Sequence, residues 1–164
     1  ALDYGRWTTG QAMLEAADRL THESAATKSQ YLLLLSGLRA LTAGQHAHSL
    51  VLDSYLLRAL SMAGYAPSLD ACVVCAQPGP QPFFHVSSGG CVCAAHRPPG
   101  SVAPRMESID LMTALLAGDW LTADGADGAA QREVSGIVAA YAQWHMERDL
   151  RSLPHVDRRD RMAT

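Results

Sequence analysis

The chain has 164 residues, about the length of one domain, and 48% of them are apolar, which is enough to bury a core without disulfide bonds. Its formal charge of −3 excludes a uniformly basic, histone-like DNA binder, but it leaves room for a local basic patch. The sequence has no apolar run of about 18 residues and no visible secretory signal, so we expect no membrane contact and a cytoplasmic location.

The sequence pattern up to residue 69 predicts three helices. The first begins at Thr8, the second spans residues 28–42 and the third spans residues 46–62, because apolar side chains recur there at helical spacing. Gly44 ends the second helix, as glycine often does. A run of leucines makes this second helix apolar nearly all round, so we expect it to be central and buried. Short connections between the helices favour an antiparallel bundle.

The helical pattern returns after Pro104. Ser108 is predicted to cap a helix over residues 109–117, and residues 123–130, rich in alanine and glycine, predict a flexible loop. A last helix is expected over residues 131–151, with Pro154 as its stop. The predicted fold is therefore mainly α, an antiparallel helical bundle with an inserted module. Its parts are residues 1–69 and 101–154 for the two halves of the bundle, residues 70–100 for the module, and residues 155–164 for a flexible charged tail.

All four cysteines of the chain lie inside the predicted module. The module opens with a CxxC pair, Cys72 and Cys75, and closes with CVCAAH, residues 91–96. Residues 83–86 and 91–93 predict two short strands of a hairpin around Ser87-Ser88-Gly89-Gly90. Clustered cysteines without a secretory signal favour a metal site over disulfide bonds. The sequence therefore predicts a zinc knuckle that carries a short β-hairpin.

A tetrahedral zinc site needs four cysteine or histidine ligands from two short turns. Cys93 and His96 repeat the two-residue gap of the opening CxxC pair, which predicts the ligands Cys72, Cys75, Cys93 and His96. An all-cysteine set with Cys91 in place of His96 is the alternative, and a set that uses His85 is a third. Four protein ligands leave no open position, so the Zn²⁺ is expected to be structural.

Two other interpretations of the cysteines are a redox CxxC motif and ordinary buried thiols. A thioredoxin-like CxxC motif follows a strand and begins a helix, whereas this one follows a helix and precedes a proline-rich stretch. The paired short gaps therefore favour a metal.

Three segments, LSMAGYAPSLDACVVC, GGCVCAAH and WHMERDLRSLP, occur in this order and together resemble the C-terminal part of the bacterial recombination mediator RecO. The resemblance covers nearly the whole chain and supports Cys93 and His96 over Cys91, although the family usually has cysteine at the position of His96. The residues that match the family pattern are Gly64, Pro67, Leu69, Cys72, Cys75, Gly89, Gly90, Cys93, His96, His145, Glu147, Leu150, Arg151 and Ser152.

The resemblance implies a non-catalytic protein of DNA repair and recombination. RecO proteins bind single- and double-stranded DNA, anneal complementary strands, and help to load RecA together with RecR and the single-strand binding protein SSB. The family also carries an N-terminal OB-fold, for which we find no run of strands here, so we expect this chain to lack that domain. A nucleoid-associated location in the cytoplasm follows from the same resemblance.

Contacts with DNA phosphates require exposed cations. The candidates flank the module or lie near and beyond the end of the last helix: Arg97, Arg105, Arg148, Arg151, Arg158 and Arg159. The acidic tail of SSB, which ends in phenylalanine, would need an apolar slot with an arginine at its rim. Arg39 and Arg58, on the second and third predicted helices, are the candidates for that contact.

Two other classes of function remain. A metal-dependent redox or hydrolytic enzyme would need an open ligand position or a catalytic base beside the cluster. A structural zinc adaptor would have the metal but no affinity for DNA.

Overall fold

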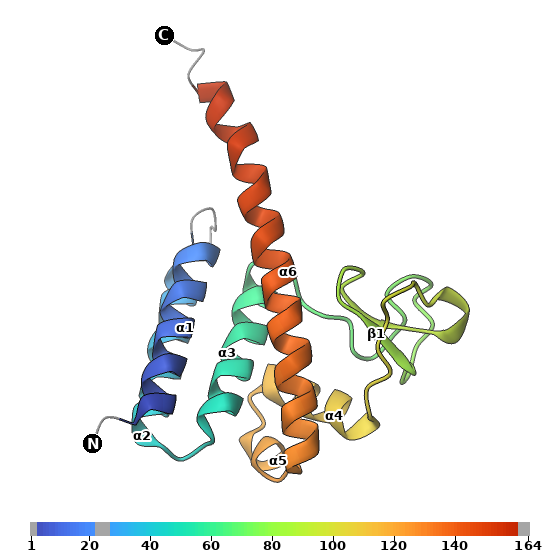
Figure 1. The fold of residues 1–164 in the computed structure, drawn as a ribbon, viewed down its shortest axis with the longest axis horizontal. Helices are drawn as coiled ribbons and strands as arrows, with labels where there is room; N and C mark the ends of the chain where they lie inside the picture. The colour runs from blue at the N-terminus through green and yellow to red at the C-terminus, as the bar shows by residue number, and fades with distance from the viewer. Residues whose placement is uncertain (1–2, 22–26, 161–164) are drawn as a thin grey trace.

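A computed structural model describes residues 3–21 and 27–160, with the backbone alone for residues 149–160. The helices of this part are α1 (Tyr4–Leu20), α2 (Thr27–Ala43), α3 (His48–Met62), α4 (Met106–Ala117), α5 (Trp120–Asp124) and α6 (Gly128–Asp160). Between α3 and α4 lie β1 (Phe83–His85), β2 (Gly90–Val92) and the short 3-10 helix η1 (Ala94–His96). The prediction of a mainly α bundle with a small β-hairpin is confirmed (Figure 1).

Helix α3 is the central element of the bundle, since it packs against α1, α2, α4 and α6. The prediction that the second helix is central is therefore wrong. Helix α2 buries Gln30, Leu33 and Leu41, whereas Leu32 is 52% exposed. Both helices are rich in leucine, but within the described residues α2 packs mainly against α1 and α3, and part of its apolar surface stays exposed.

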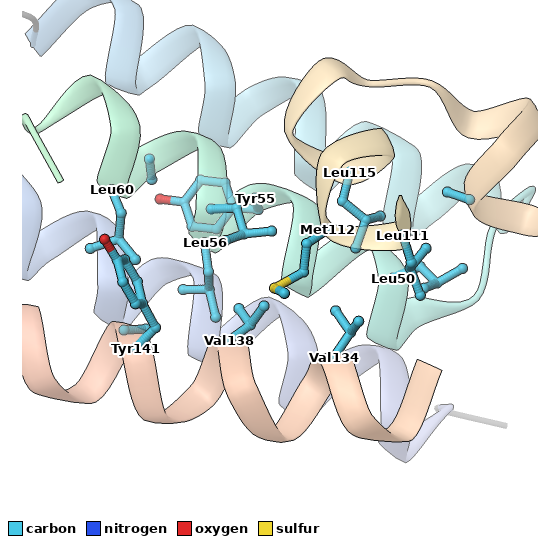
Figure 2. Packing of buried hydrophobic residues seen from close by; sticks show 14 of the residues in the cluster. Leu50, Tyr55, Leu56, Leu60, Leu111, Met112, Leu115, Val134, Val138 and Tyr141 are labelled. Atoms are coloured by element: carbon cyan, nitrogen blue, oxygen red, sulfur yellow. The ribbon is translucent and has the colours of Figure 1, made fainter. Parts of the chain in front are cut away.

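The core lies where α3, α4 and α6 meet (Figure 2). Leu60 on α3 and Met112 on α4 are completely buried, and Val138 on α6 packs into the same cluster. The core residues of each of these helices recur about every three or four positions, which places them on one face of the helix. The core therefore joins the two halves of the bundle across the inserted module.

Two helix starts differ from the prediction. Helix α1 begins at Tyr4 rather than Thr8, because the side chain of Asp3 accepts hydrogen bonds from the backbone N–H groups of Gly5 and Arg6. Helix α4 begins at Met106, so Ser108 lies inside its first turn and is fully buried rather than capping it. Gly118 ends α4 in the left-handed conformation.

The segment expected to be a flexible loop, residues 123–130, instead contains helix ends. Asp119 accepts a hydrogen bond from Thr122 N–H and so caps α5. Asp127 accepts one from Ala130 N–H at the start of α6. Helix α6 also continues beyond Pro154 to Asp160, past the ends of its neighbours (Figure 1). Because proline removes one backbone hydrogen bond without forbidding helical torsions after it, the predicted stop at Pro154 is wrong.

The β-hairpin pairs β1 with β2 in antiparallel register, with Phe84 opposite Cys91. Gly90 has a φ of +152° and lies directly against the backbone of Ser68, so a side chain at this position would collide with it. Cys91 N–H also donates to Ser68 O, which ties β2 to the segment that leaves α3. Over the described residues, no helix is both long enough and apolar enough to cross a membrane.

Candidate metal centre

Four side chains from two turns of the inserted module converge on one point. The sulfur atoms of Cys72, Cys75 and Cys93 and a ring nitrogen of His96 all lie within 4.8 Å of one another. Cys75 Sγ lies 4.0 Å from Cys93 Sγ, and Cys93 Sγ lies 3.1 Å from His96 Nδ1. The structure thus brings together the four residues that the sequence predicted as ligands.

Each half of the cluster is a tight turn. In the first, Ala76 N–H donates to Cys72 O, and Ala76 adopts a φ of +61°, which reverses the chain directly after Cys75. In the second, His96 N–H donates to Cys93 O within η1. In each turn, the two residues separated by two positions therefore direct their side chains towards the common centre of the cluster.

The spacing of the donor atoms fits a tetrahedral metal. With Zn–S bonds of about 2.3 Å, two sulfur atoms at a tetrahedral zinc ion lie about 3.8 Å apart. The separation of 4.0 Å between Cys75 Sγ and Cys93 Sγ is close to that value. Three thiols and one imidazole nitrogen are also donors that zinc prefers. These residues could therefore hold a metal ion with little rearrangement.

The surroundings of Cys72 favour the thiolate that a metal requires. Hydrogen bonding from the backbone of Cys75, followed by that of Cys93 and Val74, lowers the pKa of the Cys72 thiol to about 6 against the opposing effect of burial. Cys93 N–H, for example, lies 3.4 Å from Cys72 Sγ. The opposite holds for Cys91, where burial, followed by the charges of Asp70 and Cys72, raises the pKa to about 11.

Cys91 is not part of the four-residue cluster. It lies on β2 opposite Phe84, and both side chains pack into the core of the bundle. Strand β2 ends at Val92, and Cys93, directly after it, packs in a different cluster from Cys91. His85 is also outside the cluster, since its Nδ1 lies 2.6 Å from Ser88 Oγ. The geometry thus favours neither the all-cysteine set nor the set that uses His85.

Burial divides the cluster into an inner and an outer side. Cys72 and Cys93 are buried together with Val92, whereas Cys75 and His96 are exposed. A metal here would connect the exposed residues Cys75 and His96 to the buried residues Cys72 and Cys93. Four protein donors fill a tetrahedral site, so this arrangement suits cross-linking of the chain.

The family profile named "Recombination protein O C terminal" matches residues 1–154. The chain belongs to this family. DNA repair protein RecO of Streptomyces griseus is 52% identical over 157 residues, which cover 95% of this chain and 63% of that protein. DNA repair protein RecO of Streptomyces coelicolor is 53% identical with the same two coverages. The chain thus spans less than two thirds of the length of these RecO relatives.

The arginines predicted to contact DNA in this RecO-family chain lie in different settings. Arg97 is exposed, and its guanidinium carbon lies 4.3 Å from the ring centre of Phe83. Arg105 contacts two carboxylates, with Nη2 3.1 Å from Asp127 Oδ1 and Nε 3.6 Å from Glu133 Oε2. Arg148 is exposed on α6. The side chains of Arg151, Arg158 and Arg159 lie outside the described residues.

Arg58 borders a small cavity of about 50 Å³ on the bundle. Leu33, Val51 and Trp120 give this cavity apolar walls. No carboxylate of the described chain lies within ion-pair distance of Arg58. The ring of Trp120 stacks on that of His46, with 4.1 Å between the ring centres. Arg39 is exposed and does not line the cavity. The sequence indicated Arg58 as a residue of this site but not Trp120. Trp120 is far from Arg58 in the sequence, and only the tertiary fold brings α5 to the cavity.

Proposed function

We propose that this chain works as the C-terminal part of a RecO-type recombination mediator in DNA repair. In this role it binds single- and double-stranded DNA, supports annealing of complementary strands, and helps RecR and SSB to load RecA. Membership of the RecO family and the name shared by its relatives support this proposal. The proposed role is one of binding rather than catalysis, at the nucleoid in the cytoplasm.

The cofactor in this proposal is a structural Zn²⁺ held by Cys72, Cys75, Cys93 and His96. The convergence of these four side chains is the observation that carries the proposal beyond family membership. Bound zinc would fix the two turns to each other, and with them the orientation of Arg97, which directly follows His96 in the chain. The chain's own contribution is to hold three thiolates and one imidazole nitrogen at one point.

Arg97 is the cation that the structure favours most for DNA. Its guanidinium lies over the ring of Phe83, and the side chain is exposed, so it remains available to a phosphate group. Arg105 would first have to release Asp127 and Glu133, which makes it the weaker candidate. Arg148 extends the set along α6, and Arg151, Arg158 and Arg159 remain candidates from the sequence.

The cavity at Arg58 is the proposed contact for the SSB tail. An acidic peptide that ends in an aromatic residue needs apolar walls and a cation for its terminal carboxylate. Leu33, Val51 and Trp120 supply the walls, and Arg58 supplies the cation. Arg39 would act from outside the cavity, as a second positive charge that attracts the acidic segment.

The test is fluorescence anisotropy with a labelled single-stranded oligonucleotide, measured over a range of salt concentrations. Arg97→Ala and Arg148→Ala should weaken binding, and each lost phosphate contact should reduce the salt slope by about one. Arg19→Ala, an exposed arginine on α1 far from the module in sequence, is the matched control and should bind as the wild type does.

Equal losses in all three variants would contradict the assignment to the module and α6. A zinc-loaded protein without any affinity for DNA would instead indicate the structural adaptor. Turnover of a substrate or of a thiol at the cluster would indicate the metal-dependent enzyme, which requires a displaced ligand, since the four donors already complete a tetrahedron.

A further inference from the structure

A groove of about 460 Å³ is lined by residues of α4, of α5 and of the segment just before α6. Helix α5 lies beside the first turns of α6 (Figure 1). Its floor is apolar, with Leu111 buried at the base and Ala126 beside it. Leu121, on α5, stands at its edge with 91% of its surface exposed. A leucine this exposed beside an open groove offers apolar surface to a second molecule.

The rim of this groove is acidic. Glu107 and Asp110 on α4 and Asp127 before α6 border it. Residues 106–131 contain five carboxylates (Glu107, Asp110, Asp119, Asp124 and Asp127) and no lysine or arginine. The local field is therefore negative, which repels DNA phosphates and the acidic tail proposed for the Arg58 cavity. This groove needs a partner of the opposite charge.

Arg105 shows that the rim can accept a guanidinium. Its Nη2 lies 3.1 Å from Asp127 Oδ1, and its Nε lies 3.6 Å from Glu133 Oε2. Glu107 and Asp110 have no such partner, since no cationic side chain of the described chain lies within ion-pair distance of either. Asp110 is therefore left for a cation from elsewhere, and Glu107, whose charge acts on Arg105 only from beyond ion-pair distance, can take a closer one.

The carboxylates are placed for separate cationic side chains rather than for one metal ion. In the described part of the chain, the cluster of Cys72, Cys75, Cys93 and His96 is the group whose donor atoms come close enough together for a metal. Glu107 and Asp110 lie one turn apart on α4, above an apolar floor. This combination of apolar floor and acidic rim matches a peptide rather than an ion.

We propose that the groove binds a cationic segment of a partner protein. In the complex, one leucine-sized side chain of the partner packs against Leu121 and Ala126, and its lysine or arginine side chains contact Glu107 and Asp110. This contact is independent of the proposed contacts with DNA and SSB, because its charge is opposite to theirs and its residues are different.

The test uses a fluorescein-labelled peptide of lysines and arginines around two adjacent leucines, with the whole chain loaded with zinc. Two comparison peptides carry serine in place of leucine, or glutamate in place of each cation. The wild type should bind the first peptide and bind both comparison peptides several-fold more weakly. Affinity for the first peptide should also fall as salt is added.

The double variant Glu107→Gln, Asp110→Asn should weaken binding by up to about tenfold, since two exposed ion pairs are lost. Leu121→Ser should weaken it several-fold without loss of fold, because this side chain is exposed. Glu15→Gln, an exposed carboxylate on α1, is the control and should change nothing. NMR amide shifts on titration should gather on α4, α5 and the first turn of α6.

Equal binding of the peptide by the wild type, the double variant and Leu121→Ser would overturn the proposal. So would amide shifts that gather on the module or on α1. Absence of binding by the correctly folded wild type at low salt would overturn it as well, whereas loss of DNA binding in the arginine variants would leave it unaffected.

Discussion

The bundle and the cysteine-rich module differ in how much apolar surface each buries. In the bundle, α3 alone contributes Leu50, Leu57 and Leu60, each at most 1% exposed, to a core shared with the five other α-helices of the described chain. The module has a separate cluster of three buried residues, Cys72, Val92 and Cys93, with Phe83 packed beside it. A cluster of that size cannot offset the conformational entropy of a segment of about thirty residues.

The two faces of the hairpin account for this difference. Phe84 and Cys91, which lie opposite each other, belong to the core of the bundle. The next pair, Phe83 and Val92, belongs to the cluster around the metal ligands. One face of the hairpin is thus held by the bundle and the other by the proposed zinc. On this proposal the module is attached to the bundle through one face and would depend on the metal for its own order.

Removal of a proposed metal ligand should have the largest effect on the difference between the module and the bundle. Cys75→Ala removes one of the four proposed zinc ligands at an exposed position, so little packing is lost. Structural zinc sites contribute about 10–16 kcal/mol of binding free energy. We expect the module to lose its order while α3, α4 and α6 remain folded. The loss of zinc would be measured as zinc content per chain. Amide exchange at Phe84 and Val102 would report the order of the module, and far-UV circular dichroism would report the helices.

The controls for that experiment lie next to the ligands. Val74→Ala, at an exposed neighbouring position, should retain zinc. Cys91→Ala should also retain zinc, although it leaves a space in the core of the bundle. Loss of zinc from Cys91→Ala together with full retention by His96→Ala would show that the all-cysteine set is the correct one.

A buried carboxylate gives the bundle a pH dependence of its own. Asp53 on α3 is 3% exposed, and burial raises its pKa from 3.8 to about 6, although Ser135 Oγ donates a hydrogen bond to it. The folded state therefore binds this proton more tightly than the unfolded state does. Above pH 6 the ionised group costs up to about 3 kcal/mol of stability, and this cost disappears as the pH falls towards 4.

Asp53→Asn should therefore stabilise the bundle at pH 7.5 and change it little at pH 4. Asparagine can still accept the hydrogen bond from Ser135 while carrying no charge. Urea denaturation followed by circular dichroism at both pH values would measure the difference. Glu15→Gln removes an exposed charge and should have no comparable effect. A variant equally stabilised at both pH values would point to packing rather than ionisation.

The sequence predicted the helices best where the signals are local. The second and third helices were expected over residues 28–42 and 46–62 and are observed over Thr27–Ala43 and His48–Met62. Glycine stops and apolar spacing act within a few residues of each helix end. Which of the two helices is central could not be read in this way, because it depends on which faces α4 and α6 cover after folding.

The same distinction applies to the sites. The proposed metal ligands lie in two short motifs, and each motif forms one turn, so the spacing in the sequence indicated their convergence. The groove beside Leu121 combines residues of α4, α5 and the segment just before α6, and the cavity beside Arg58 combines α2, α3 and Trp120. No motif in the sequence links such residues, and α5, whose last two residues overlap the loop expected over residues 123–130, was not predicted.

Tyr141 gives the smallest and most specific test of how the two regions are joined. Its hydroxyl donates to Tyr65 O at 3.0 Å, and its ring lies 6.0 Å from that of Phe84 on β1. Tyr141→Phe removes the hydrogen bond alone and should lower the stability of the bundle by about 1 kcal/mol, with zinc content unchanged. Tyr31→Phe, at a position 61% exposed, is the control and should have no effect.

Tyr141→Ala would remove the ring as well, and with it the contact to the hairpin. If the module depends on the bundle only through one face, amide exchange at Phe84 and Val102 should then accelerate while zinc remains bound. Release of zinc by Tyr141→Ala would instead show that the metal turns need the bundle in order to form. The two regions would then fold as one unit, and the division of the hairpin between two stabilising forces would be incorrect.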